Sequence, residues 1–120
     1  MVKLVFCCRR RPELSIEDFQ ERWLAVHGPL VKRLRAQLPQ MQRYVQSHTL
    51  PGPATDMLTQ SRGAKEPYDG ITEVWFPSVE ALAMSEADAL DAARQLLEDE
   101  GKFIDLPNSA VFLTEEHEIF

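Results

Sequence analysis

The sequence predicts an α+β protein in which strands and helices follow each other in the order βαββαβ. Four segments have the apolar or alternating pattern of β-strands, and a helical pattern follows the first and the third of them. The length of 120 residues, 44% of them hydrophobic, suits one globular domain, expected to span residues 1–120. The order is that of the ferredoxin-like sandwich, a four-stranded antiparallel sheet with helices on one face.

The first strand and the start of the first helix have clear boundaries. Residues 1–8 form an apolar run of strand length that ends at the three arginines 9–11. Ser15 is the expected N-cap of the helix, and Asp18 takes the third position of a capping-box variant. We therefore expect a strand, a short loop and a helix that begins just after Ser15.

One face of this helix carries its aromatic side chains. Phe19, Trp23 and Val26 recur at helical spacing, which predicts a buried stripe that His27 continues. Gly28-Pro29 is expected to interrupt the helix and to leave the imidazole of His27 free to point inward.

The middle of the chain predicts two strands joined by a long connection. Residues 41–50 alternate as a half-polar strand would, with Tyr44 and His48 on one face. Residues 51–67 contain several prolines and glycines and little periodicity, which predicts a long functional loop or lid. Residues 69–76 alternate again and form the expected third strand.

The last part of the chain predicts the second helical layer and the final strand. Ser78 is the expected cap of a short helix, and Ser85 with Asp88 caps a longer one that ends at Gly101. Residues 110–120 form the expected fourth strand.

The two faces of the sheet are expected to have different partners. One face, toward the helices, is expected to form a pocket for a small apolar molecule, lined by Phe6, Trp23, Thr72, Val74 and Phe76. The other face would expose apolar side chains to water, so a homodimer is expected to bury it. Its predicted interface residues are Val45, Ile71, Glu73 and Trp75. Glu73 has two interpretations: an acid/base pair with Asp69, or an ion pair with Arg43 across the interface.

Charge and hydropathy exclude several classes of protein. The net charge of −6 argues against a nucleic-acid binder, and the apolar runs are too short for a membrane span or a signal peptide. Residues 1–45 are basic and residues 46–120 acidic. This pattern is expected if the two halves interleave within the fold, if they meet across a symmetric dimer, or if they are simply two solvated surfaces. Cys7 and Cys8 are adjacent and cannot form a useful cross-link, so a cytoplasmic location is expected.

Several short motifs follow one another along nearly the whole chain. They are Arg9-Arg10-Arg11-Pro12, Phe19 to Trp23, His27-Gly28-Pro29-Leu30, Arg43 to His48, Tyr68 to Phe76, Phe103-Ile104-Asp105 and Glu116-His117. Together they resemble the EthD family of the dimeric α/β-barrel superfamily. The resemblance implies a ferredoxin-like protomer, a homodimer with a barrel-like centre and a small cavity between sheet and helices. Founding members of the family belong to fuel-ether degradation beside an oxidising system, and similar proteins are fungal polyketide tailoring enzymes.

The chain departs from two relatives of that family. Related polyketide cyclases use a His-Tyr pair at the start of the second helical layer, where haem-binding members place an axial His. Residues 78–90 contain neither His nor Tyr, which puts both roles in doubt. The chain also lacks metal-ligand spacings and nucleotide-binding glycine motifs, so we expect no metal and no cofactor.

The remaining chemistry lies in the histidines and one tyrosine. His27 and His48 are expected to approach the pocket as general acid/base groups, and Tyr44 to stabilise an oxyanion. Each histidine has a structural alternative, a hydrogen bond to a backbone carbonyl or a place at the rim, and His117 is expected at the surface or the dimer edge. Two hypotheses follow: a cofactor-independent proton-transfer enzyme for a small apolar carbonyl compound, or a non-catalytic accessory protein that binds such a molecule for a neighbouring oxygenase. Two titratable groups that converge in the pocket would favour the enzyme.

Overall fold

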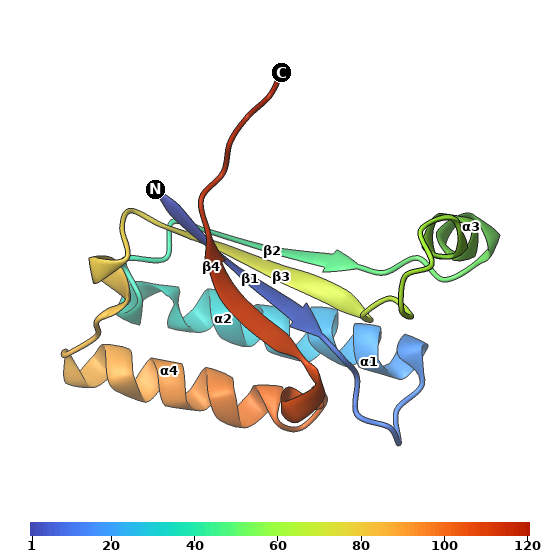
Figure 1. Ribbon diagram of the computed structural model, residues 1–120. Coiled ribbons are helices and arrows are strands. Elements are labelled where there is room, and N and C mark those ends of the chain that lie inside the picture. The colour runs from blue at the N-terminus through green and yellow to red at the C-terminus, as the bar shows by residue number, and fades with distance from the viewer.

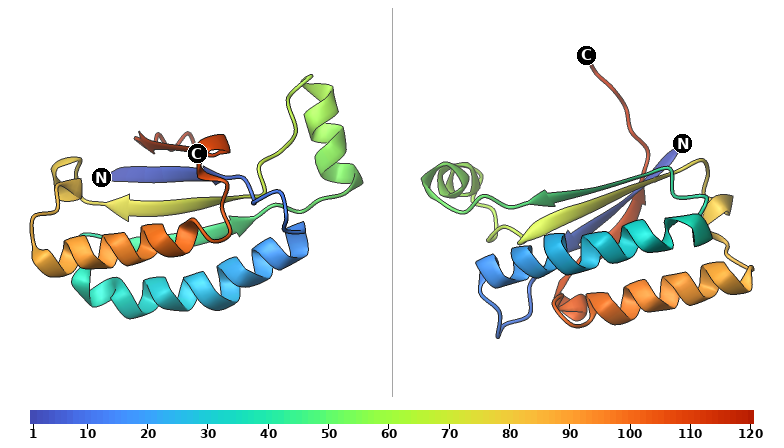
Figure 2. Two further views of the ribbon diagram at one scale, coloured as in Figure 1. Left: turned by 90° about the horizontal axis from the view of Figure 1, so that it is seen from below. Right: turned by 180° about the vertical axis from the view of Figure 1, so that it is seen from behind.

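The computed structural model describes residues 1–120 and confirms the predicted ferredoxin-like fold, with one unpredicted helix between the second and third strands (Figure 1). The elements are β1 (Val2–Cys8), α1 (Ile16–Arg22), α2 (Gly28–Leu34), β2 (Arg43–His48), α3 (Pro53–Ser61), β3 (Gly70–Phe76), α4 (Ala87–Glu100) and β4 (Ala110–Thr114). The strands are antiparallel in the order β2-β3-β1-β4. Helices α1, α2 and α4 lie on one face of this sheet, as the ferredoxin-like fold requires (Figure 2). None of the helices has both the length and the apolar character of a membrane span.

The first helical layer is continuous, so the predicted interruption at Gly28-Pro29 is wrong. A π-helical turn, Trp23–His27, joins α1 to α2, and the Gly28 N–H donates to the carbonyl oxygen of Trp23. A π turn accommodates one extra residue and shifts the faces of the helix that follows it. Val26 is consequently 45% exposed, whereas His27 is buried. The predicted burial of Val26 is therefore also wrong.

The helix caps agree with the sequence at two of three positions. The Ser15 hydroxyl accepts the N–H of Asp18 at 3.0 Å, which confirms the first cap. The Ser78 hydroxyl accepts the N–H of Ala81 at 3.3 Å, at the start of the short helical turn before α4. The third cap, Ser85, is wrong because α4 begins one residue later, after Glu86, whose side chain makes no capping bond.

Trp23 packs directly on the backbone of the sheet. It belongs to the larger core cluster, which consists of Cys8, Phe19, Trp23, Phe103 and Ile104. A Cβ atom at Gly70 would lie 2.2 Å from the Trp23 ring, so only glycine fits opposite it. The cluster also seals the thiol of Cys8, and burial raises its pKa to about 12. Cys8 is therefore an unreactive core residue.

We expect Gly70→Ala to lower the free energy of unfolding by about 2 kcal/mol, because the added methyl overpacks a rigid site. Urea unfolding followed by tryptophan fluorescence measures this change. Gly101→Ala is the matched control, since a Cβ there would meet its nearest neighbour at an ordinary 3.6 Å. Equal stability of the two variants would contradict the tight packing of Trp23 on β3.

Three predicted segments differ from the structure. Residues 51–67 contain the helix α3, which has no buried residue and projects beyond the end of the sheet (Figures 1 and 2). Strand β2 starts at Arg43, so Met41 lies outside the strand alternation and packs beneath the helices. Strand β4 ends at Thr114, and residues 115–120 leave the sheet.

The uncovered face of the sheet carries the four predicted interface residues. Val45 and Glu73 are directly paired across β2 and β3, and Ile71 and Trp75 lie on the same face. The acid/base pair of Glu73 with Asp69 is wrong, whereas the ion pair of Glu73 with Arg43 across the interface stays a prediction. The Glu73 carboxylate pairs with Lys3 at 2.7 Å, whereas Asp69 is buried and pairs with Arg10. The guanidinium of Arg43 lies 4.7 Å above the Trp75 ring.

Candidate functional site

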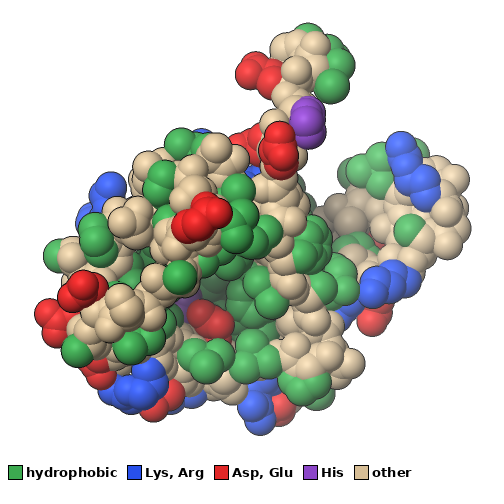
Figure 3. All heavy atoms as spheres, turned by 60° about the vertical axis from the view of Figure 1, so that its left-hand side comes forward, with side chains coloured by type: hydrophobic (Ala, Val, Ile, Leu, Met, Phe, Trp, Pro, Cys, Tyr) green, Lys and Arg blue, Asp and Glu red, His purple; other side chains and the backbone are tan.

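A cavity of about 460 Å³ lies between the inner face of the sheet and the helices. Seventeen of its 21 lining residues are hydrophobic. Figure 3 shows this hollow from one side, with hydrophobic walls and with histidine and acidic surface inside it. The five residues predicted for the pocket all line the cavity: Phe6, Trp23, Thr72, Val74 and Phe76.

His27 reaches this cavity from the π-helical turn. Its Nδ1 lies 2.7 Å from Oδ2 of Asp99, and Arg22 donates to the other carboxylate oxygen at 2.7 Å. Burial raises the pKa of Asp99, but the hydrogen bonds from His27 and Arg22 outweigh it and leave that pKa below its ordinary value. Asp99 is thus an ionised acceptor, and Nδ1 must carry the proton that it shares with Asp99.

The opposite nitrogen of His27 is therefore the basic one. Nε2 has no hydrogen-bond partner within the chain, although His27 is only 3% exposed. Burial lowers the pKa of His27, and the nearby Asp99 opposes this only in part. The imidazole is neutral near pH 7, with a lone pair on Nε2 available to accept a proton.

Glu100 is a candidate site residue that the sequence analysis missed. It is the last residue of α4, and its side chain lines the cavity. Burial raises its pKa to about 7, with a further contribution from the charge of Asp99. The carboxyl end of a helix also disfavours a negative charge. Glu100 therefore exchanges its proton close to neutral pH, as a general acid or base must.

The spacing of α4 contains a signal for Glu100. Ala89, Leu96 and Glu100 recur at helical spacing on the face that packs against the rest of the protein. A carboxylate at the end of an apolar stripe is expected to be partly buried. Glu100 belongs to an acidic run, Glu98-Asp99-Glu100, which has the composition of a solvent-exposed helix end. The burial of Glu100 is therefore hard to recognise from the sequence.

The raised pKa of Glu100 makes stability depend on pH. The folded protein binds this proton more tightly than the unfolded chain, so the stabilisation is complete below about pH 4.5 and is lost as the pH rises toward 7. We expect Glu100→Gln to raise the free energy of unfolding by on the order of 3 kcal/mol near pH 8 and by little near pH 4. Urea unfolding at both pH values measures this difference. The same change at both would show that packing, and not ionisation, is responsible.

Tyr44 and His48 lie on the inner face of β2, but they do not share the cavity. Tyr44 lines it, and Gln46 donates to the Tyr44 hydroxyl at 3.2 Å. His48 is stacked flat on Trp23, 4.6 Å between ring centres, and its Nε2 lies 2.8 Å from Oε1 of Gln46. The expectation that His48 reaches the cavity is wrong, because Trp23 fills the space beside Gly70.

The polar side chains of Tyr44, Gln46 and His48 form a connected chain on the inner face of β2. Gln46 links His48 to Tyr44 and also donates to the carbonyl oxygen of Trp23 at 3.0 Å. Burial raises the pKa of Tyr44, so its hydroxyl keeps its proton. Because the hydroxyl oxygen accepts from Gln46, its O–H remains able to donate to a ligand oxygen.

The structure contains no cluster of side chains that could bind a metal ion. No three His, Cys, Asp or Glu side chains lie together in a way that could hold an ion. Cys7 and Cys8 are free thiols, and His117 is exposed on the segment after β4. The expected absence of a cofactor stays a prediction.

Known proteins share this fold. The family described as EthD domain matches residues 11–107. An EthD family protein from Bacillus halodurans is 18% identical, covers 98% of this chain and 99% of its own, and has a TM-score of 0.59. An EthD-like protein from Ralstonia eutropha is 16% identical, covers 95% of this chain and 89% of its own, and has a TM-score of 0.61. A dimeric ferredoxin-like protein of unknown function from Thermobifida fusca is 12% identical, covers 96% of this chain and 90% of its own, and has a TM-score of 0.61. No curated protein matches the chain.

Proposed function

This chain belongs to the EthD domain family, and we propose that it binds a small, largely apolar carbonyl compound and transfers a proton on it without a cofactor. The observation that carries the proposal is the convergence of two titratable side chains, His27 and Glu100, on one apolar cavity. A site that only stores an apolar molecule has no need of a carboxyl group with a pKa near 7.

The residues suit proton abstraction next to a carbonyl group. Ionised Glu100 takes a proton from the carbon beside the carbonyl, and the electron pair of that C–H bond moves to form an enolate. The O–H of Tyr44 donates to the enolate oxygen and stabilises its charge. The proton then returns from Glu100, or from His27 after exchange, to the same carbon or to another position.

The apolar lining sets the class of ligand. A cavity of about 460 Å³ accommodates a bicyclic or medium-chain molecule, and its walls offer few hydrogen bonds. One carbonyl oxygen accepts the O–H of Tyr44, and the rest of such a compound lies against the apolar walls.

Hydrogen–deuterium exchange of 2-tetralone tests this proposal. We expect the protein to accelerate exchange of the protons beside the carbonyl, as followed by NMR in D2O. Ala93→Phe, which fills the cavity from α4, should abolish both binding and exchange. Leu90→Phe, at a half-exposed position of the same helix, should leave both unchanged.

The same experiment separates catalysis from storage. Binding of 2-tetralone without any acceleration of exchange would overturn the catalytic proposal and favour the accessory binding protein. An absence of binding would overturn both.

A homodimer through the uncovered face of the sheet is part of the proposal. Ile71 is 38% exposed and Phe112 50% exposed on a face that no helix covers (Figure 1). A second copy would bury these side chains by packing sheet against sheet. Two of the structural neighbours, from Bacteroides fragilis and Thermobifida fusca, are described as dimeric, which supports this arrangement. The adjacent free thiols of Cys7 and Cys8 support a cytoplasmic location.

A further inference from the structure

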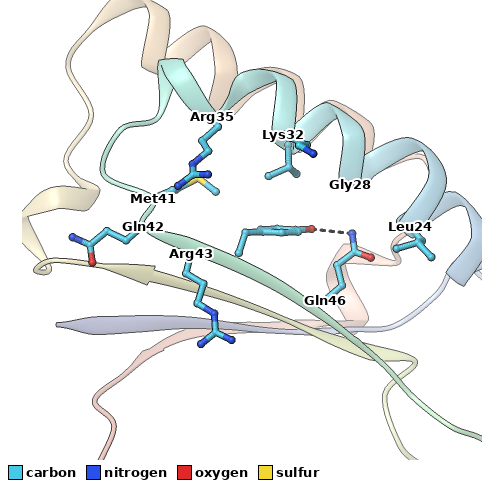
Figure 4. Close-up of a pocket in the computed structure, with 10 residues that line it drawn as sticks. Leu24, Gly28, Lys32, Arg35, Met41, Gln42, Arg43 and Gln46 are labelled. Carbon is cyan, nitrogen blue, oxygen red and sulfur yellow. Dashed lines mark hydrogen bonds between the residues drawn. The ribbon is translucent and has the colours of Figure 1, made fainter.

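A second cavity, of about 540 Å³, lies between α2 and the edge strand β2. Figure 4 shows this α2–β2 groove, with the helix on one side and the strand on the other. Its lining contains no Asp or Glu, although the chain has 19 acidic residues and a net charge of −6. An acidic protein thus presents a groove without any acidic side chain.

Two cations lie on the helix side of this groove. Lys32 comes from α2 and Arg35 from the turn that follows it, and Arg35 extends toward the strand (Figure 4). Both side chains are free of ion pairs within the protomer, since no carboxylate lies within 4.0 Å of either. A third cation, Arg43, lies at the strand side, but its guanidinium turns to the Trp75 ring. The open charges are therefore those of Lys32 and Arg35.

The groove and the sheet–helix cavity have a common wall. Val31, Met41 and Tyr44 line both spaces. The Tyr44 hydroxyl in this wall accepts a hydrogen bond from Gln46, and methionine side chains such as Met41 change shape at little cost. The two spaces are therefore neighbours, and the side chains of Val31, Met41 and Tyr44 separate them.

We propose that the α2–β2 groove binds the anionic head group of the ligand whose apolar body occupies the sheet–helix cavity. The substrate class is then an amphipathic carboxylate or phosphate, since an arginine and a lysine together recognise either group by charge-assisted hydrogen bonds. This inference rests on the proposed function, because the apolar body lies in the cavity where proton transfer would occur.

Paired ligands that differ only in the head group test the inference. The probes are 4-phenylbutyrate, 3-phenylpropyl phosphate and the neutral 4-phenyl-1-butanol, with affinities measured by calorimetry. We expect one or both anions to bind at least about tenfold more tightly than the alcohol. The tighter of the two anions identifies the head group.

Two double variants locate the head group. Lys32→Gln with Arg35→Gln should remove this advantage and leave the affinity for the alcohol unchanged. Arg33→Gln with Lys102→Gln removes the same charge from exposed positions outside the groove and should change neither affinity. The control separates a local site from the net charge of the protein.

The possible results distinguish this inference from the proposed function. If anions and alcohol bind equally, or if both double variants weaken the anions alike, the head-group site is overturned while the cavity stands. If no probe binds, the ligand cavity itself is overturned, and the head-group site with it.

Discussion

Glu100→Gln is expected to lower the rate of proton exchange on 2-tetralone by about 10²- to 10⁴-fold, the contribution of a positioned acid/base group. The amide cannot accept or release a proton near neutral pH, yet it has almost the same shape as the carboxyl group. Binding of the ketone should therefore change little. A loss of rate at constant affinity would identify Glu100 as a group that acts in the reaction.

The pH dependence gives this prediction a second readout. Because the ionised carboxylate is the base, the rate of the unmodified protein should rise with pH through the Glu100 pKa of about 7 and then level off. Glu98→Gln is the matched control, since Glu98 lies on the same helix but is exposed and pairs with Arg94. An unchanged rate in Glu100→Gln, or an equal loss in Glu98→Gln, would contradict the proposed role.

Ile71→Arg is expected to weaken dimerisation by about 10²- to 10³-fold, because association would then bury an unpaired charge. Ile71 lies on β3, a central strand of the sheet, on its uncovered face. Light scattering across a concentration series measures the change in dissociation constant. Because the side chain is already partly exposed in the protomer, the variant should fold.

Ala36→Arg is the control for the dimer. Ala36 is exposed on the turn after α2, on the helical side of the molecule, and its substitution should leave association unchanged. A monomer at micromolar concentration for the unmodified protein, or dimerisation unaffected by Ile71→Arg, would contradict the interface on the sheet.

The sequence was sufficient to predict the parts of the fold that depend on local pattern. Strand alternation predicts which side chains of β3 face the helices, because successive residues of a strand point to opposite faces. The Ser15 cap was also predictable from local pattern, because its hydrogen bond spans only three residues. These features require no knowledge of distant contacts.

The features that sequence reasoning missed depend on tertiary packing. The π turn that orients His27 replaces the expected interruption at Gly28-Pro29, and its hydrogen bonds leave no sequence signal of their own. His48 fails to reach the cavity because Trp23 lies over the sheet at Gly70, a contact between distant parts of the chain. The ionisation of Glu100 likewise depends on the walls that surround it.

The most direct test of this account is the titration of the Glu100 carboxyl group, observed by ¹³C NMR with and without 2-tetralone. We expect a pKa of about 7 in the free protein. We expect a further rise when the ketone occupies the cavity, because an apolar ligand displaces water from the carboxylate. A Glu100 carboxyl group that titrates at its ordinary value of about 4.5 and does not respond to the ketone would contradict the account.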